Sequence, residues 1–112
     1  MIWNPEHECM SPESLQTLQF ARLKNLVERV YTNVPFYRKK LEAAGICPAD
    51  IKTLSDIAKL PFTSKDDLRD TYPYGLLAVP QSEIVEIHMS SGTTGTPVVD
   101  AYTRRDMDDW AE

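Results

Sequence analysis

The sequence predicts an α+β fold in which a helical N-terminal region is followed by a β-hairpin. Apolar residues recur at helical spacing between residues 15 and 34. Three Thr-x-x-Asp sites, typical of helix starts, begin at Thr53, Thr63 and Thr103. Near the C-terminal end, two alternating apolar stretches flank a loop of small residues. We expect residues 1–80 to form a helical subdomain and a second unit to begin within 81–112.

A long helix is expected over residues 12–32. Ser11 supplies an N-cap, and Pro12 fits the first helical position. The apolar stripe that follows is wide, which predicts burial on more than one side. Residues 1–10 lack periodicity, so we expect a poorly ordered or docking arm, and the size of Trp3 favours its packing onto another element.

Further helices are expected to be short. Pro35 ends the long helix, because a residue that precedes proline disfavours the helical conformation. A second helix follows it and stops at Gly45. The expected ranges are 36–44, a single turn at 49–51, and helices near 54–59, 64–71 and 104–112.

The hairpin is expected to pair strands 84–89 and 98–102. Val85, Ile87 and Met89 alternate with polar residues, which places them on one face of the first strand. The loop between the strands reads SSGTTGTP, from Ser90 to Pro97. It contains no charged residue and is longer than the two to five residues that usually close a hairpin.

The composition of this loop suits phosphate binding. Gly92 and Gly95 let the backbone approach a bulky ligand, and consecutive backbone N–H groups attract anions. The hydroxyl groups are further donors. The alternative is a solvated Gly/Ser/Thr loop without a ligand. The SSGTTGTP loop is not a Walker loop, since no lysine follows Gly95, and it has no G-x-G-x-x-G pattern.

Composition limits the remaining function classes. The formal net charge of −5 argues against a nucleic-acid ligand. Neither a membrane span nor a signal peptide is apparent, so we expect a cytoplasmic location. Cys9 and Cys47 are expected to be free thiols, and we expect no metal site built from Cys and His. The short basic runs 38–40 and 104–105 are expected to be solvated faces.

Several motifs taken together resemble phenylacetate–coenzyme A ligases of the adenylate-forming superfamily. The match extends over most of the chain, and its linked motifs are more specific than a lone SGTTG. The matching stretches are RVYxNVPFYR at 29–38, LPFTxKxDLR at 60–69, YPxGLxAVP at 72–80, IHxSSGTTGxP at 87–97 and YT at 102–103.

This resemblance implies a two-step reaction. A carboxylate, typically phenylacetate, attacks the α-phosphate of ATP to give an acyl-adenylate and pyrophosphate, and coenzyme A then displaces AMP. Mg²⁺ accompanies ATP. The family's loop for the β- and γ-phosphates corresponds to Ser90, Ser91, Gly92, Thr93, Thr94, Gly95 and Thr96. Residues 81–112 would then begin the AMP-binding domain.

The cation that this loop needs is expected elsewhere in the chain. Many family members have lysine where Thr96 stands, and the wider superfamily often has one where Val98 stands. Lys65, at the start of a predicted helix, is the catalytic candidate, against the alternative of a solvated surface lysine. Arg69 is a weaker candidate.

Two further residues have roles suggested by their place in the loop region. By analogy with the family, Thr94 would lie nearest Mg²⁺ or the γ-phosphate. His88 is expected to be structural, although its position just before the loop leaves a role in the acyl pocket open.

The helix expected at 104–112 has no stop signal, and a lone hairpin is marginal. We therefore expect the chain to be the front part of a longer enzyme and to be inactive by itself. The partners expected are ATP, phenylacetate and coenzyme A, together with a second copy in a homodimer and strand exchange in the isolated piece. The alternatives are another acyl-activating enzyme of the superfamily or a noncatalytic interaction module.

Overall fold

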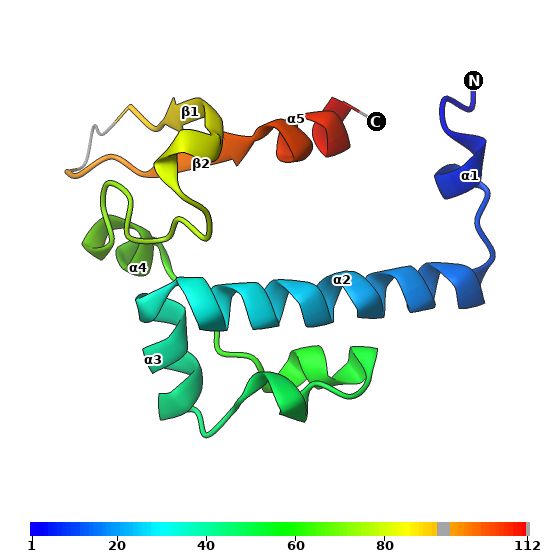
Figure 1. Ribbon diagram of the computed structural model, residues 1–112, viewed down its shortest axis with the longest axis horizontal. Coiled ribbons are helices and arrows are strands. Elements are labelled where there is room, and N and C mark those ends of the chain that lie inside the picture. The colour runs from blue at the N-terminus through cyan, green and yellow to red at the C-terminus, as the bar shows by residue number, and fades with distance from the viewer. Residues whose placement is uncertain (92–94, 112) are drawn as a thin grey trace.

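The computed structural model describes residues 1–91 and 95–111 and confirms the α+β class. Figure 1 shows the elements in chain order. The α-helices are α1 (Pro5–Glu8), α2 (Pro12–Asn33), α3 (Pro35–Ala43), α4 (Lys65–Asp70) and α5 (Arg104–Ala111). The 3₁₀ helices are η1 (Pro48–Asp50), η2 (Leu54–Lys59) and η3 (Gln81–Glu83), and the strands are β1 (Ile84–Met89) and β2 (Val99–Thr103).

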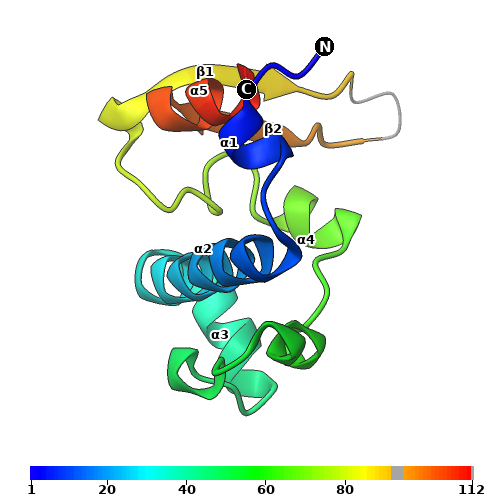
Figure 2. The same cartoon turned by 90° about the vertical axis from the view of Figure 1, so that its right-hand side faces the viewer.

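The long helix α2 separates two layers. On one side of it lie α3, η1 and η2, which pack against it. On the other side lie the hairpin and α5, as Figure 2 shows when the molecule is viewed nearly along α2. The N-terminal segment with α1 and the end of α5 both lie on the hairpin side.

The core lies between α2, α3 and the segment after η1. Val27, Leu41 and Ile51 are each less than 5% exposed and pack together, and Val34 is fully buried. Partly buried neighbours complete the cluster: Phe20, Leu23, Tyr31, Ile46 and Leu60. The wide stripe of α2 was expected to be buried on more than one side, and that expectation is wrong. Leu15 and Leu26 remain 42% and 49% exposed, since the hairpin layer does not close onto them.

Local capping explains where the helices begin. The Ser11 hydroxyl accepts the backbone N–H of Ser14 at the start of α2. At η2 and α5, the carboxylates of Asp56 and Asp106 accept the backbone N–H groups of Thr53 and Thr103. These starts are as predicted. The segment 54–59 is nevertheless a 3₁₀ helix, and α4 begins after Ser64 and not after Thr63.

The N-terminal ten residues differ from expectation. They contain the short helix α1, because the side chain of Asn4 accepts the His7 N–H and Pro5 fits the first position. Trp3 does not pack onto another element and is 75% exposed.

The basic run 38–40 was expected to be a solvated face; Arg38 and Lys39 are exposed and Lys40 is partly buried, and two of the three have partners in the protein. The Arg38 guanidinium donates to the carbonyls of Tyr31 and Thr32, at 2.8 and 2.7 Å, and so caps the C-terminal end of α2. Lys40 pairs with Asp67 of α4. A run of like charges in the sequence does not reveal that Arg38 and Lys40 have partners elsewhere in the chain.

The hairpin is antiparallel, with Ile87 opposite Ala101 and Met89 opposite Val99. This register confirms that the apolar residues share a face. The first strand spans 84–89 as predicted, and the second is shifted by one residue to 99–103. Both cysteines are free and exposed. None of the described helices combines the length and the hydropathy needed to cross a bilayer.

Candidate functional site

The loop predicted to hold phosphate projects from the hairpin and is closed by Ser90 and Val98. The Ser90 N–H donates to the Val98 carbonyl at 3.0 Å, and the Val98 N–H donates to the Ser90 hydroxyl at 2.9 Å. The Ser90 oxygen is therefore an acceptor within the protein, and its own proton remains available to a ligand. This double closure fixes both ends of the loop to the two strands.

The described part of the loop presents donors on the surface. Ser90, Ser91, Gly95 and Thr96 are all exposed. Gly95 has φ of +130°, a conformation that side-chain-bearing residues rarely adopt, and an added Cβ would meet no atom within 4 Å. Glycine is needed here for backbone conformation and not for space. Gly92, Thr93 and Thr94 lie outside the described residues.

Lys65 occupies the first position of α4 and is exposed. Its helix begins with a reciprocal cap: the Asp67 N–H donates to the Ser64 hydroxyl at 3.2 Å, and the Ser64 N–H donates to the Asp67 carboxylate at 2.7 Å. A lysine at this end opposes the helix dipole slightly. The local structure therefore gives Lys65 no evident stabilising role.

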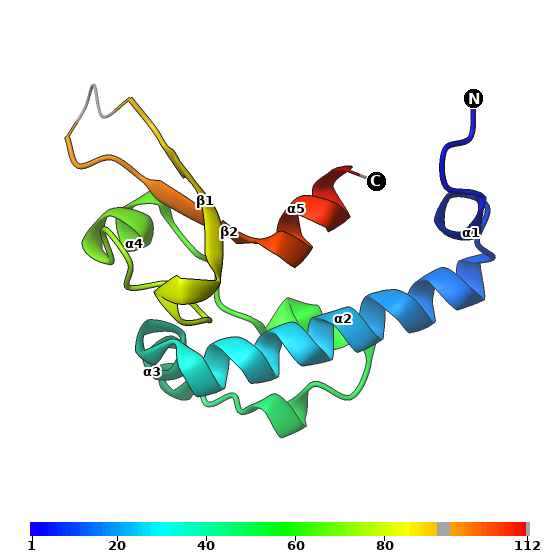
Figure 3. The same cartoon turned by 45° about the horizontal axis from the view of Figure 1, so that its top comes forward.

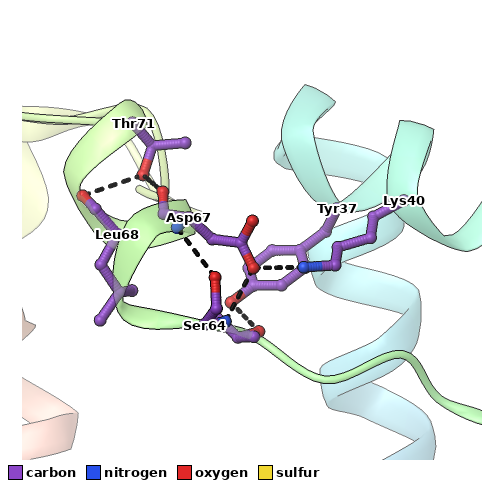
Figure 4. Close-up of polar contacts among 7 residues, drawn as sticks. Tyr37, Lys40, Ser64, Asp67, Leu68 and Thr71 are labelled. Carbon is purple, nitrogen blue, oxygen red and sulfur yellow. Dashed lines mark hydrogen bonds and ion pairs between the residues drawn. The ribbon is translucent and has the colours of Figure 1, made fainter.

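Helix α4 is fixed to α3 by two polar contacts, shown in Figure 4. Lys40 of α3 reaches the Asp67 carboxylate and forms an ion pair with it. The Tyr37 and Thr63 hydroxyls are 3.1 Å apart, immediately before α4. The Lys40 ammonium and then the Ser64 N–H lower the pKa of Asp67. These contacts hold the start of α4, and hence the backbone of Lys65, in a defined place.

Helix α4 also borders the hairpin. Leu68 of α4 and residues 99–102 of β2 line one cavity of about 220 Å³. Figures 1 and 3 both show α4 on the side of the molecule where the loop leaves the strands. The structure thus brings the helix that carries Lys65 and the hydroxyl-rich loop to one end of the molecule.

The other sequence candidates have protein partners. Arg69 donates to Asp66 at 3.3 Å, and its side chain is only 27% exposed. His88 lies 2.5 Å from the Glu86 carboxylate and packs against the rings of Tyr102 and Trp110, with ring centroids 5.2 and 5.9 Å away. These contacts account for the position of His88 and support its structural interpretation.

Two features were not identified from the sequence. Arg22 and Arg29 of α2 line a cavity together with residues of α5, and Lys40 pairs with Asp67.

No group of three or more His, Cys, Asp or Glu residues that could hold a metal occurs in the described ranges.

Comparison with known proteins gives one consistent result. No family model matches the chain. It is 52% identical over 104 residues to the phenylacetate-coenzyme A ligase of Aromatoleum evansii, covering 93% of this chain and 24% of that enzyme. It is 50% identical over 112 residues to the phenylacetate-coenzyme A ligase of Thermus thermophilus, covering 100% of this chain and 25% of that enzyme.

The fold has a close counterpart among solved structures. A 2-hydroxyisobutyryl-CoA ligase, in complex with 2-HIB-AMP and CoA, superposes with a TM-score of 0.83 at 35% identity. The match covers 93% of this chain and 23% of that one. The chain is thus a homologue of the phenylacetate-coenzyme A ligases and spans about a quarter of their length.

Proposed function

We propose that the chain supplies the phosphate-holding part of an ATP-dependent ligase that converts phenylacetate to its coenzyme A thioester. The observation that supports the proposal is that the exposed loop and α4, which bears Lys65, lie toward the same end of the molecule (Figures 1 and 3). The exposed hydroxyls of Ser90, Ser91 and Thr96 and the backbone at Gly95 would donate to the β- and γ-phosphates. Lys65 would supply the positive charge that the loop lacks.

The chemistry asked of these residues is positioning and charge stabilisation. A carboxylate oxygen of the acid bonds to the α-phosphorus of ATP, and pyrophosphate leaves with its charge held by the loop and Lys65. The thiolate of coenzyme A then forms the thioester and releases AMP. No general base is required in the first step, because the attacking carboxylate is already ionised. Mg²⁺ bound to the phosphates would neutralise part of their charge.

The identity of the acid rests on the relatives. Identity is 52% to a phenylacetate enzyme and 35% to the 2-hydroxyisobutyryl-CoA ligase, which favours phenylacetate. A related candidate is a ligase for another small carboxylic acid, since the 2-hydroxyisobutyryl-CoA ligase matches the fold with a TM-score of 0.83. A cytoplasmic location agrees with substrates of this kind.

The proposal can be tested in a chimera of the Aromatoleum evansii enzyme, in which this chain replaces its 104 matching residues. We expect the chimera to form phenylacetyl-CoA from phenylacetate, ATP and coenzyme A. Lys65→Ala in the chimera should raise the KM for ATP or lower kcat by about tenfold or more. Lys52→Ala, a change of the same kind outside the site, is the matched control.

One result would contradict this function, and another would contradict only the role of Lys65. A chimera that folds but forms neither adenylate nor thioester would refute the assignment of the chain to such a ligase. If Lys65→Ala behaved like Lys52→Ala, Lys65 would be removed from the site while the loop proposal survived. The adenylate can be followed separately by pyrophosphate release, which identifies the step affected.

We also propose that the isolated chain forms a homodimer through the hairpin. Both strands have an unpaired edge in the described sheet, and Val85, Ile87 and Met89 are each at least 46% exposed. Exposed apolar strand edges favour pairing with a second copy.

A further inference from the structure

A cleft lies between α2 and α5, away from the hydroxyl-rich loop. It has a volume of about 400 Å³, near the lower end of the range for small-molecule sites. Figures 1 and 3 show α5 extending over the middle of α2. Arg22, Asn25 and Arg29 line the cleft from α2, and Arg105 lines it from α5.

The α2 wall presents hydrogen-bond donors along one helical face. Arg22, Asn25 and Arg29 are spaced by three and four residues, which aligns them on the same side of the helix. A guanidinium has only donors, in a planar fork that matches the oxygens of a phosphate. The Asn25 amide between the two guanidiniums can donate as well. Such a wall suits an anion with several oxygens.

The two acidic residues of the cleft offset only part of this charge. The Asp106 carboxylate accepts the Thr103 N–H at 2.8 Å and the Thr103 hydroxyl at 2.7 Å, and so caps α5. These bonds, and then the charges of Arg29 and Arg105, lower the pKa of Asp106. Asp109 stands 4.0 Å from Arg105.

The guanidiniums of α2 are less engaged. Within residues 1–91 and 95–111, no hydrogen bond or ion pair to Arg22 or Arg29 is recorded, apart from the longer-range attraction between Arg29 and Asp106. The chain carries a net charge of −5, so three arginines around one cavity are a local departure from its overall field.

We propose that this cleft binds a phosphate group of a nucleotide, with Arg22, Arg29 and Arg105 as the cationic contacts and Asn25 as a neutral donor. Two sources share this chemistry. Coenzyme A carries a diphosphate and a 3′-phosphate, and ATP carries a triphosphate. Phosphate binding in the cleft is inferred from the residues that line it. The expectation that coenzyme A, and not ATP, supplies this phosphate rests on the proposed function.

The test is a titration of the ¹⁵N-labelled 112-residue chain, at fixed ionic strength, with coenzyme A, dephospho-coenzyme A, ATP and adenosine 3′,5′-bisphosphate. We expect the Asn25 side-chain amide and the backbone amides of residues 103–106 to shift. Arg22→Gln and Arg29→Gln should each weaken binding by about tenfold, the loss of one charge-assisted hydrogen bond. Arg29→Lys, which keeps the charge, should recover part of the affinity.

Lys24→Gln is the matched control, because it removes the same charge from an exposed residue of α2 that does not line the cleft. Tighter binding of coenzyme A than of dephospho-coenzyme A would support a 3′-phosphate contact. The proposal is overturned if the arginine variants bind like Lys24→Gln, or if every ligand shifts only residues 88–96. Shifts at 88–96 report on the loop of the proposed function, so the two proposals can fail independently.

Discussion

Ile51 shows how much the small core depends on single side chains. It is 2% exposed and packs with Val27 and Leu41. We expect Ile51→Ala to lower the free energy of unfolding by about 2–5 kcal/mol, through lost burial and the cavity left behind. Ile57→Ala, at a residue that is 56% exposed, is the control and should cost less than about 1 kcal/mol. Urea denaturation measures both, and equal effects would contradict this description of the core.

Asp67 makes stability depend on pH. Its pKa lies below the ordinary value of 3.8, chiefly because of Lys40. A carboxyl group whose pKa is lowered by folding stabilises the protein above its unfolded pKa, and that contribution is lost as the pH falls. Stability should therefore decrease below about pH 5. The pKa values of Asp50, Asp56 and Asp106 are lowered too and act in the same direction.

The variant Asp67→Asn tests this dependence. We expect the urea midpoint of the variant to fall less steeply with decreasing pH than that of the wild type. Asp66→Asn is the control, since the Asp66 side chain is 83% exposed. An unchanged slope in Asp67→Asn would show that the ion pair with Lys40 does not form in solution.

Among the elements, α5 depends on ring contacts to the hairpin. Trp110 lies 5.4 Å from the Tyr102 ring and 5.9 Å from the His88 ring, measured between centroids. Aromatic pairs contribute about 0.5–1.5 kcal/mol each beyond their burial. We expect Trp110→Ala to speed amide hydrogen exchange across residues 104–111, with partial recovery in Trp110→Phe. Trp3→Ala, at an exposed tryptophan, should leave this exchange unchanged.

Local signals made most elements predictable. Ser11, Thr53 and Thr103 cap helices through residues three positions away, so their starts could be read directly from the sequence. Helix α1 was missed although Asn4 and Pro5 carry the same signal, because the segment is too short to show periodicity. Whether 54–59 forms an α or a 3₁₀ helix depends on packing, which a cap does not determine.

Long-range contacts were not predictable in this way. Lys40 and Asp67 are 27 residues apart, and nothing in their local sequence pairs them. The arginines of α2 and α5 meet only because the hairpin folds back over α2. For the candidate site, the loop was predicted from its composition and from motif resemblance, and Lys65 from motif resemblance. Their placement at one end of the molecule required the fold.

At the scale of the whole molecule, the chain is expanded for its size. Its radius of gyration is 16.1 Å, whereas a compact domain of about 100 residues has about 13 Å. Its accessible surface is 8204 Å², against about 6300 Å² expected for a monomer of this mass. The excess exceeds the surface of about 800 Å² that each partner buries in a standard interface.

This excess leads to a prediction about association. The isolated chain should dimerise with increasing concentration, measured by light scattering or sedimentation. Ile87→Lys, on the exposed face of β1, should weaken the dimer, while Leu15→Lys at an exposed position of α2 should not. A monomer at high concentration, or equal effects of the two variants, would contradict a hairpin-mediated dimer.

The central claim, that the hydroxyl-rich loop holds the phosphates of a nucleotide, is tested most directly by titrating inorganic triphosphate into the ¹⁵N-labelled chain. The account predicts saturable shifts at the amides of Ser90, Ser91, Gly95 and Thr96, weakened by Lys65→Ala and unaffected by Lys52→Ala. Triphosphate that left these amides unmoved, while shifting residues elsewhere or none, would contradict it.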